Sequence, residues 1–399
     1  MATEDRKIYL DVAGRMHSLY RGLVVYPPTG YRFLTEPTAW DRVSSYASST
    51  NLIHSALFRT LGTLVPVNLT KAYLERFKRP PKSTDLTYAT GHLVFRKEPW
   101  VVDLEFVTQL AGYSIKHFKR YKKLIERVLS SEYCKKIICW TEAGKRTILE
   151  NMNCWGFEHK VEVVPLAVPP KSFSKDYNSK KVIKLLFVGS ANIPGEFEYK
   201  GGKEVLEAFA LLCKEHSNLE LVIRSDIPKQ IRNKYRGLGN LRLIGEIIPW
   251  EQLEQEFKSA DIFLLPSHST PGLAILDAMS YELPVITTDV WANSEMVSNG
   301  KTGFVIRKSA DVPYYTENFI PNWDYHSNSP FMKSIRTTDL KVVEELAEKT
   351  NILIGNKELR QKMGKAGRQE IESGKFSIEK RNEKLKRIFD EAIGDGARK

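Results

Sequence analysis

The residues best suited to chemistry lie between Leu264 and Val285, in the segment LLPSHSTPGLAILDAMSYELPV. An apolar strand is expected to end near Pro266, and a helix to begin near Leu273 after a loop of small residues. Such a helix start directs free backbone N–H groups and the positive end of the helix dipole beyond the strand, which suits a phosphate. Asp277, one turn inside the helix, could accept hydrogen bonds from a ribose, although an acid near a helix start is favourable without any ligand. The segment therefore predicts a nucleotide site.

Two further features could add to this site. Pro271 stiffens the loop ahead of the helix, and Gly272 lets the backbone come close to a phosphate. Lys200 stands just ahead of another predicted helix and could point its ammonium at a diphosphate. It could equally be a solvated lysine before a capping glycine, and spacing alone does not separate the two interpretations. Arg224, at the end of a predicted strand over 219–223, is a candidate for a second positive charge.

Two common nucleotide-binding motifs are absent from the sequence. The loop 189–195 reads GSANIPG and lacks the G-x-G-x-x-G spacing of dinucleotide-binding proteins. The stretch from Lys200 to Lys203 is followed by Glu204, so a P-loop would have no Ser or Thr for its metal ion. If the chain binds a nucleotide, it therefore does so in another way.

The organisation of the chain favours two α/β domains. Its 399 residues exceed the usual size of one domain, and 42% of them are hydrophobic, enough for two cores. Strand and helix patterns alternate over 182–306 in the manner of a doubly wound parallel sheet, whereas the N-terminal half is less regular. We expect a domain over residues 1–175, a second over 176–377, and a last helix over 378–399 that crosses back to the first. Ligands are then expected in a cleft at the carboxyl ends of the strands.

The N-terminal half offers its own candidate residues. Asp103 and Glu105 follow each other at strand spacing, so both carboxylates are expected on one side of a strand. Crowding of two carboxylates raises one pKa and would create a general acid or base; the alternative is a structural pair that binds backbone or an arginine. His92 ends the preceding strand, and Gly14 and Arg15 follow the first strand in a loop.

Taken together, these segments resemble the retaining family-4 glycosyltransferases (glycosyl transferases group 1) of the GT-B fold. The resemblance rests on the string L-L-P-S, G-L-A-I-L-D-A-M and L-P-V-I, on Lys200-Gly201, and on Glu295 followed by Asn299 to Gly303. It implies two Rossmann-like domains facing a cleft, and transfer of a sugar from a nucleoside diphosphate sugar to a hydroxyl acceptor, a glycan or glycolipid. It implies no cofactor and no metal, because lysine and helix dipole carry the charge of the diphosphate.

The resemblance also assigns roles to residues of this chain. The donor-binding residues are expected to be Lys200, Arg224, Ser269, Thr270, Pro271, Gly272, Leu273 and Asp277. The residues expected to bind the acceptor are Gly14, Arg15 and His92. Those expected to take part in catalysis are Glu105, Asp103 and Lys200.

The chain departs from the family pattern at three places. The family has a glutamate eight residues before the second acid, where this chain has Ser269. The neighbouring His268 could compensate in part, although a histidine between serines is more often exposed. Glu105 stands where the family has histidine, and Ser190 where it has arginine. These changes keep open an alternative, a catalytically inactive GT-B protein that binds a nucleotide sugar or a glycan.

Charge and composition limit the partners. The net charge of +12 suits an anionic partner, but no nucleic-acid-binding motif is present, so we expect none of that class. The helical stretch from Lys116 to Arg127 holds six Lys or Arg and one Glu. It could contact an anionic membrane surface, or be a core-packed helix with a solvated basic face. The charged start of the chain and the four scattered cysteines favour a cytoplasmic protein, with the membrane contact at the inner face.

Overall fold

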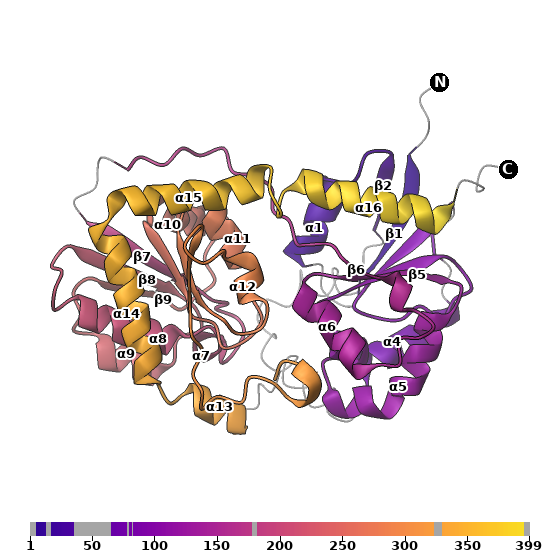
Figure 1. Ribbon diagram of the computed structural model, residues 1–399, viewed down its shortest axis with the longest axis horizontal. Coiled ribbons are helices and arrows are strands. Elements are labelled where there is room, and N and C mark those ends of the chain that lie inside the picture. Colours follow the sequence, from indigo (N-terminus) through magenta and orange to yellow (C-terminus); the bar gives the residue numbers. More distant parts are fainter. Residues whose placement is uncertain are drawn as a thin grey trace. The chain divides into compact units, whose positions relative to one another are not determined.

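The computed structural model describes residues 5–394 apart from 13–16, 36–64, 78–79, 82, 178–181 and 323–328. The chain divides into two compact units, coloured in sequence order in Figure 1. Unit 1 comprises Met1–Ala167, Glu317–Ile320 and Ile378–Lys399, and unit 2 comprises Val168–Thr316 and Pro321–Ser377. The boundary expected after residue 175 falls earlier, and a short segment near residue 318 belongs to unit 1. Each unit contains a six-stranded parallel sheet, which confirms the predicted α/β class.

The sheet of unit 1 has the strand order β2-β1-β3-β4-β5-β6, with every pairing parallel. Its central strands read as short apolar runs because helices cover both faces of a parallel sheet. The strands are β1 (Arg6–Val12), β2 (Tyr31–Leu34), β3 (Leu86–Thr90), β4 (Trp100–Leu104), β5 (Cys134–Cys139) and β6 (Val161–Val163). The register pairs Val12 with Thr90 and Thr90 with Asp103, so the ends of β1, β3 and β4 lie at one edge.

The helices of unit 1 lie on both faces of this sheet (Figure 1). They are α1 (Ser18–Val25), α4 (Val67–Leu74), η1 (Glu75–Phe77), η2 (Val107–Ala111), α5 (Ile115–Ser130), α6 (Glu142–Asn151), η3 (Glu158–Lys160), η4 (Glu317–Phe319) and α16 (Ile378–Ile393). The last helix, α16, packs on β3 and β5. Its Phe389 ring contacts the rings of Tyr31, Phe33 and Tyr88, and Asp390 accepts a hydrogen bond of 2.5 Å from the Tyr31 hydroxyl. The C-terminal helix is therefore part of the core of unit 1.

The sheet of unit 2 has the order β12-β11-β10-β7-β8-β9, again all parallel. Its strands are β7 (Ile183–Val188), β8 (Leu219–Arg224), β9 (Leu241–Ile244), β10 (Ile262–Leu265), β11 (Val285–Thr288) and β12 (Gly303–Ile306). The strands β7 and β10 are neighbours although helices and two other strands separate them in sequence. The loops that follow β7 and β10 therefore leave the same edge of the sheet side by side.

Nine helices of the described part of unit 2 complete its layers. They are α7 (Glu196–Tyr199), α8 (Gly202–Leu212), α9 (Lys229–Tyr235), α10 (Trp250–Ser259), α11 (Leu273–Ser280), α12 (Asn293–Met296), α13 (Pro330–Ile335), α14 (Leu340–Gly355) and α15 (Lys357–Glu372). The closest helix pairs are α8 with α14 and α11 with α15. Buried apolar side chains of these strands and of α8 and α11 form part of the core of unit 2.

Candidate functional site

The segment 264–285 forms the strand, loop and helix that the sequence predicted. The strand β10 ends at Leu265, the loop follows, and α11 begins at Leu273 with Gly272 as its N-cap residue. Gly272 has extended backbone angles and no side chain to cap the helix, so the first N–H groups of α11 receive no side-chain cap. Pro271, Gly272 and Leu273 are half-buried, whereas Thr270 is buried. This helix start offers backbone donors to an anion.

The Lys200 side chain points into this loop. It is buried, and its Nζ donates a 2.7 Å hydrogen bond to the backbone oxygen of Thr270. The carboxylate of Glu196, one turn earlier, lies 3.9 Å from the same ammonium. Of the two interpretations of this lysine, the solvated one is wrong. The parallel pairing of β7 with β10 explains the contact, because it places the two loops next to each other.

Gly201 explains how the chain brings Lys200 this close. Its φ of +79° lies in the left-handed region, where a side chain is disfavoured. A Cβ on Gly201 would lie 2.3 Å from the backbone oxygen of Pro266, at the start of the loop. The absence of a side chain thus allows the start of α8 and the loop after β10 to touch.

Arg224 is the last residue of β8, at the strand end where the sequence placed it. Its Nη1 donates a 2.7 Å hydrogen bond to the backbone oxygen of Gly189, at the end of β7. Burial lowers the pKa of this half-buried guanidinium. Arg224 is therefore held by the loop after β7, beside Ser190.

Asp277 lies on α11 as predicted, with its side chain half-buried. Burial raises the pKa of this carboxyl to about 6, and the ammonium of Lys171 lowers it in part. That ammonium also lies 5.0 Å from the ring centre of Trp250 and 5.9 Å from that of Tyr281. At pH 7 Asp277 is mostly ionised and can accept hydrogen bonds, as contact with a ribose would require.

The two residues at the centre of the loop are both buried. Ser269 is 3% exposed, and its hydroxyl has no hydrogen-bond partner among the residues that the structure describes. His268 is also 3% exposed, so the expectation of an exposed histidine is wrong. The loop turns inward because the His268 N–H donates to the backbone oxygen of Tyr199 at 2.8 Å. This contact turns the imidazole away from solvent.

Asp103 and Glu105 do not form the expected pair of carboxylates. The strand β4 ends at Leu104, so the alternation of a strand does not extend to Glu105. Asp103 accepts hydrogen bonds from the Tyr20 hydroxyl at 3.1 Å and from Trp140 Nε1 at 3.0 Å. Glu105 instead lies 3.4 Å from the Tyr113 hydroxyl. The prediction that both acids lie on one face of a strand required β4 to continue through Glu105, and the strand ends one residue earlier.

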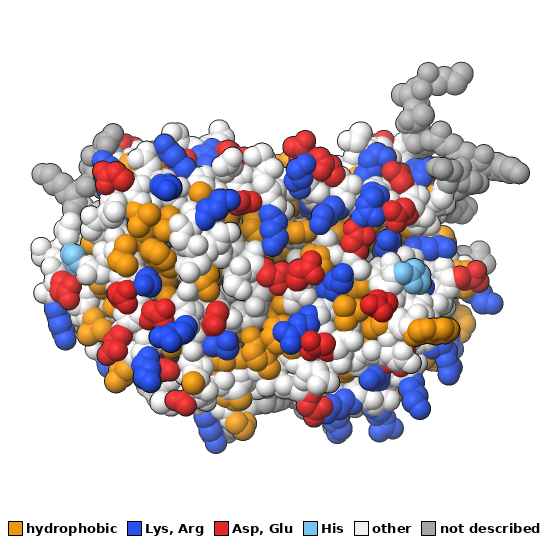
Figure 2. Space-filling view, in the orientation of Figure 1, with side chains coloured by type: hydrophobic (Ala, Val, Ile, Leu, Met, Phe, Trp, Pro, Cys, Tyr) orange, Lys and Arg blue, Asp and Glu red, His pale blue; other side chains and the backbone are white. Residues whose placement is uncertain are grey.

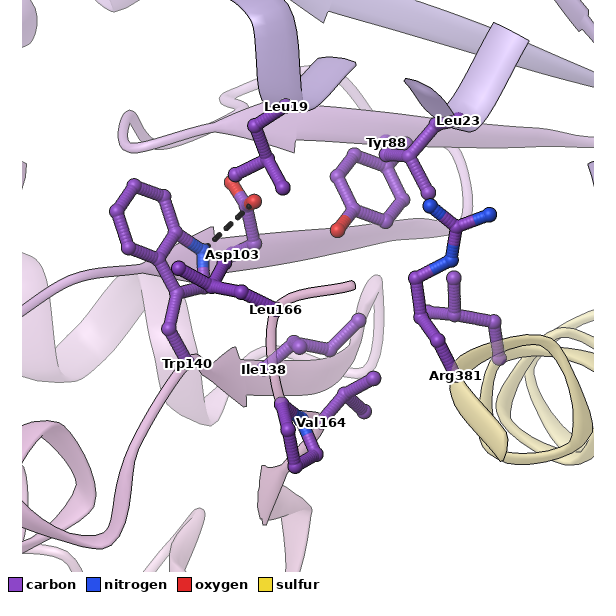
Figure 3. A pocket seen from close by; sticks show the side chains of 11 residues that line it. Leu19, Leu23, Tyr88, Asp103, Ile138, Trp140, Val164, Leu166 and Arg381 are labelled. Carbon is purple, nitrogen blue, oxygen red and sulfur yellow. Dashed lines mark hydrogen bonds between the residues drawn. The ribbon is translucent and has the colours of Figure 1, made fainter. Parts of the chain in front are cut away.

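Asp103 lies in a small pocket of unit 1 (Figure 3). Aliphatic side chains line most of it, among them Leu19 and Leu385, and Arg381 of α16 reaches the side opposite Trp140. Burial raises the pKa of Asp103 to about 7, although hydrogen bonds from Trp140 and the neighbouring tyrosines lower it. The cause of the raised pKa is therefore desolvation and not a second carboxylate.

His92 lies in a buried cluster of charges at the end of β3. Its Nε2 is 3.4 Å from Asp11 Oδ1, and its Nδ1 is 3.2 Å from the backbone oxygen of Thr90. Lys71 lies 3.6 Å and Arg96 3.3 Å from the same aspartate. Burial raises the pKa of Asp11, but His92 and the two cations hold it well below its usual range. Asp11 was not among the predicted site residues, although its place near the end of the first strand could have indicated it.

The same cluster contains three groups with the chemistry of metal ligands. The ligand atoms of Asp11, Glu75 and His92 all lie within 4.8 Å of one another. Lys71 is 3.5 Å from the Glu75 carboxylate as well as close to Asp11, so cations of the chain already balance both acids. Ion pairing accounts for this arrangement. Gly14 and Arg15, expected to bind the acceptor, lie outside the described residues.

The basic stretch from Lys116 to Arg127 lies on α5. The apolar side of α5 packs into unit 1, with Phe118, Ile125 and Leu129 buried. The basic side remains at the surface, and Figure 2 shows Lys and Arg side chains gathered where α5 lies. Across the described residues, the helices are all too short or too polar to cross a membrane. The core-packed interpretation of this helix therefore holds for its apolar side, and its basic side carries exposed Lys and Arg residues.

The C-terminal half of the chain has recognisable relatives. Residues 183–318 match the family model described as glycosyl transferases group 1. This part of the chain is therefore similar to that family. The capsular polysaccharide biosynthesis glycosyltransferase CapM of Staphylococcus aureus is 26% identical over 195 residues, which cover 48% of this chain and 43% of CapM. Glycogen synthase of Mycobacterium tuberculosis is 32% identical over 126 residues, 30% of this chain and 29% of that enzyme. The chain spans less than half the length of the curated relatives that it matches.

Solved structures extend the likeness to the whole fold. A glycosyltransferase from Rickettsia africae aligns with a TM-score of 0.59 at 14% identity, covering 99% of this chain and all of that one. The Anabaena protein Alr3699/HepE, solved with UDP and glucose, also gives 0.59 at 14% identity over 96% of this chain and 99% of its own. At such identity the likeness shows the fold, which is GT-B.

Proposed function

We propose that this protein transfers a sugar from a nucleoside diphosphate sugar to a hydroxyl group of a glycan or glycolipid. The observation that supports this most is the 2.7 Å hydrogen bond between Lys200 Nζ and the backbone oxygen of Thr270. This bond holds the buried Lys200 ammonium at the loop that leads into α11. The first N–H groups of α11 have no side-chain cap. A lysine charge and a row of backbone N–H groups together suit the two phosphates of a nucleoside diphosphate.

The remaining donor contacts follow from the placement of Asp277. Its carboxylate lies on α11, beyond the N–H groups that we assign to the diphosphate, and is ionised at neutral pH. We infer that it accepts hydrogen bonds from the ribose hydroxyls. Ser269 and Thr270 lie between these groups and are the residues that we expect nearest to the sugar. Arg224, bound to Gly189, would contribute through its charge at a greater distance.

We further propose that the reaction proceeds without a metal ion and with retention of anomeric configuration. The departing diphosphate gains negative charge, which the Lys200 ammonium and the dipole of α11 can offset in a buried setting. The acids near this loop are engaged by basic groups, Glu196 by Lys200 and Glu204 by His268. Retention is an expectation from the family resemblance, and NMR of the product anomer would test it. Asp103 and Glu105 remain the candidates for acceptor activation.

Nucleotide binding is the first property to measure. Because the Anabaena relative was solved with UDP and glucose, and TarM and GtfA with UDP, UDP is the first probe. We expect isothermal titration calorimetry to detect one of UDP, GDP or ADP, with equal affinity in EDTA and in magnesium. Incubation with the matching sugar nucleotide should then release sugar slowly. Binding of none of the three would refute the donor site at 266–277, and binding that EDTA abolishes would refute metal independence.

A catalytically inactive GT-B protein is the second candidate. Ser269 and Glu105, which replace a charged and an imidazole group of the family, favour it. Such a protein would bind the nucleotide in calorimetry but would show neither hydrolysis nor transfer of sugar to any glycan or lipid acceptor. Sugar release above the rate of the Lys200→Ala variant would exclude this candidate.

The exposed basic side of α5 supports a further part of this proposal, contact with an anionic membrane at the inner face of the cell membrane. Lys and Arg side chains near such a surface contribute about 1 kcal/mol each, and salt screens this attraction. We expect the protein to co-sediment with vesicles that contain phosphatidylglycerol at low salt, and not with neutral vesicles. Replacement of Lys116, Lys122 and Lys123 by glutamate should abolish this binding. Equal sedimentation of the triple variant would show that α5 is not the contact.

A further inference from the structure

Three buried polar side chains of unit 2 contact one another in a row next to the loop 267–272, which we call the donor loop. The imidazole of His268 lies between Glu204 of α8 and Tyr314. Its Nε2 is 3.1 Å from Glu204 Oε1, and its Nδ1 is 3.2 Å from the Tyr314 hydroxyl. The His268 and Tyr314 rings also stack, with centres 6.0 Å apart and planes 16° from parallel. All three side chains are less than 5% exposed.

The hydrogen-bond donors and acceptors of Glu204, His268 and Tyr314 are matched when the imidazole carries one proton. Nε2–H then donates to the Glu204 carboxylate, and Nδ1 accepts from the Tyr314 hydroxyl. Both ring nitrogens are thus occupied, so His268 has no nitrogen left for a ligand. The imidazole acts here as a connection between α8 and Tyr314, and any effect on a ligand must pass through the backbone of the loop.

The segment 199–204 holds the donor loop at three points. The backbone oxygen of Tyr199 accepts from the His268 N–H at 2.8 Å. Lys200 Nζ donates to the Thr270 oxygen at 2.7 Å, and Glu204 contacts the His268 ring. Two of these three contacts fall on His268, directly before the residues whose N–H groups we assign to the diphosphate. Loss of the imidazole would remove the contact with Glu204. The backbone contact with Tyr199 and the side-chain contact of Lys200 would remain.

Two buried oxygen atoms nearby make this arrangement costly for stability. Glu204 Oε2 and the Ser269 hydroxyl are both inaccessible to solvent, and neither has a hydrogen-bond partner in the described part of the chain. A buried polar atom without a partner costs about 1–3 kcal/mol, so an apolar pair in place of Glu204 and His268 would favour folding. A costly polar contact beside a binding loop is the pattern expected of groups retained for function.

We propose that Glu204, His268 and Tyr314 are positioning residues for the donor diphosphate. They hold the loop 267–272 so that its backbone N–H groups and the Lys200 ammonium converge on the phosphates. This inference rests on the proposed function and adds to it a buried Glu–His–Tyr connection. A charged side chain at position 269 would order the loop by direct contact with the ligand. Here, the three residues order the loop through its backbone.

The test compares UDP binding, or that of whichever nucleotide the wild-type protein binds, across matched variants. His268→Ala should weaken binding by about tenfold or more, because the loop loses its side-chain contacts to Glu204 and Tyr314. His268→Gln should stay within about threefold of wild type, since its amide can donate to Glu204 and accept from Tyr314. Tyr314→Phe, which removes one bond and keeps the ring, should lie between them. His216→Ala, which removes a histidine bound to Asn351 elsewhere in unit 2, should bind as the wild type does.

Turnover separates positioning from general damage to the fold. A loosened donor loop should raise the KM for the sugar nucleotide and lower kcat, and leave the KM for the acceptor unchanged. Wild-type affinity in His268→Ala would overturn the inference while leaving the proposed function intact. Equal weakening in His268→Ala and His268→Gln, with an equal loss of Tm, would also overturn it, since packing would then explain the effect. A wild-type protein that binds no nucleoside diphosphate would refute the proposed function itself.

Discussion

Replacing Lys200 by alanine is expected to lower kcat/KM for sugar transfer by about 100- to 1,000-fold, the usual effect of removing one preorganised group that stabilises transition-state charge. Two effects act in the same direction. The departing diphosphate loses an ammonium that stands at its binding loop, and the loop loses the hydrogen bond to Thr270. Steady-state rates with the sugar nucleotide, together with UDP affinity from calorimetry, measure this loss.

Two further variants separate the effect of the Lys200 charge from the effect of its hydrogen bond to Thr270. Lys200→Gln keeps a side-chain N–H that can reach the Thr270 oxygen but carries no charge, so it should remain folded and remain slow. Lys203→Ala removes the next lysine of the chain, whose ammonium binds the backbone oxygen of Arg336, and should have near-normal rates. If Lys200→Gln turned over at the wild-type rate, the ammonium would have no electrostatic role and the phosphate assignment would be wrong.

The Lys200→Ala variant should also change the state of Glu196. Burial raises the pKa of this carboxyl, and the Lys200 ammonium partly lowers it. Without the ammonium, the pKa of Glu196 should rise further. The higher pKa makes it easier for this buried carboxyl to take up a proton, which limits the cost of an unpaired buried charge. A wild-type melting temperature with low turnover is the combination that we expect.

The sequence sufficed for the parts of the site that depend on local patterns. Strand β10, the loop and α11 follow from an apolar run, small residues and a second apolar run with helical spacing. The approach of Lys200 to this loop was also predictable in outline, because parallel sheets place the ends of neighbouring strands at one edge. What the sequence could not decide was whether the lysine is solvated. That depended on the closeness of Gly201 to Pro266, which is a tertiary contact.

Contacts distant in sequence account for the errors. His268 looked exposed because serines flank it, yet its partners lie at Glu204 and Tyr314, far away on both sides in the chain. The pairing of Asp103 with Glu105 assumed that β4 continues past Leu104. The chain leaves the strand there, and a Cβ on Gly144 would lie 2.4 Å from the Glu105 backbone oxygen. Such close packing of a helix against the end of a strand leaves no pattern in the strand itself.

The second large effect is on the stability of the protein, and it arises from the burial of Asp103. The pKa of Asp103 is about 7 in the folded protein, against 3.8 for an unperturbed aspartate. Below pH 4 the folded and unfolded chains both hold this proton, and the neutral carboxyl contributes fully to stability. As the pH rises from 4 to 7, the unfolded chain loses the proton first, so the free energy of unfolding falls. Above pH 7 the loss is complete, on the order of 4 kcal/mol from about 1.4 kcal/mol per pKa unit.

Asp103→Asn should therefore stabilise the protein at pH 8 and make little difference at pH 4. The amide has the shape of the protonated acid: its oxygen can accept from Trp140 Nε1, and its N–H group can donate to the Tyr20 hydroxyl. Denaturant unfolding of wild type and variant from pH 4 to pH 8 measures the difference, with Asp5→Asn as an exposed control from the same unit. A less stable Asp103→Asn at pH 8 would mean that the ionised carboxylate is the better partner for Tyr20 and Trp140, contrary to the burial argument. Turnover of the same variant then decides whether Asp103 also activates the acceptor, because a general base cannot be replaced by an amide.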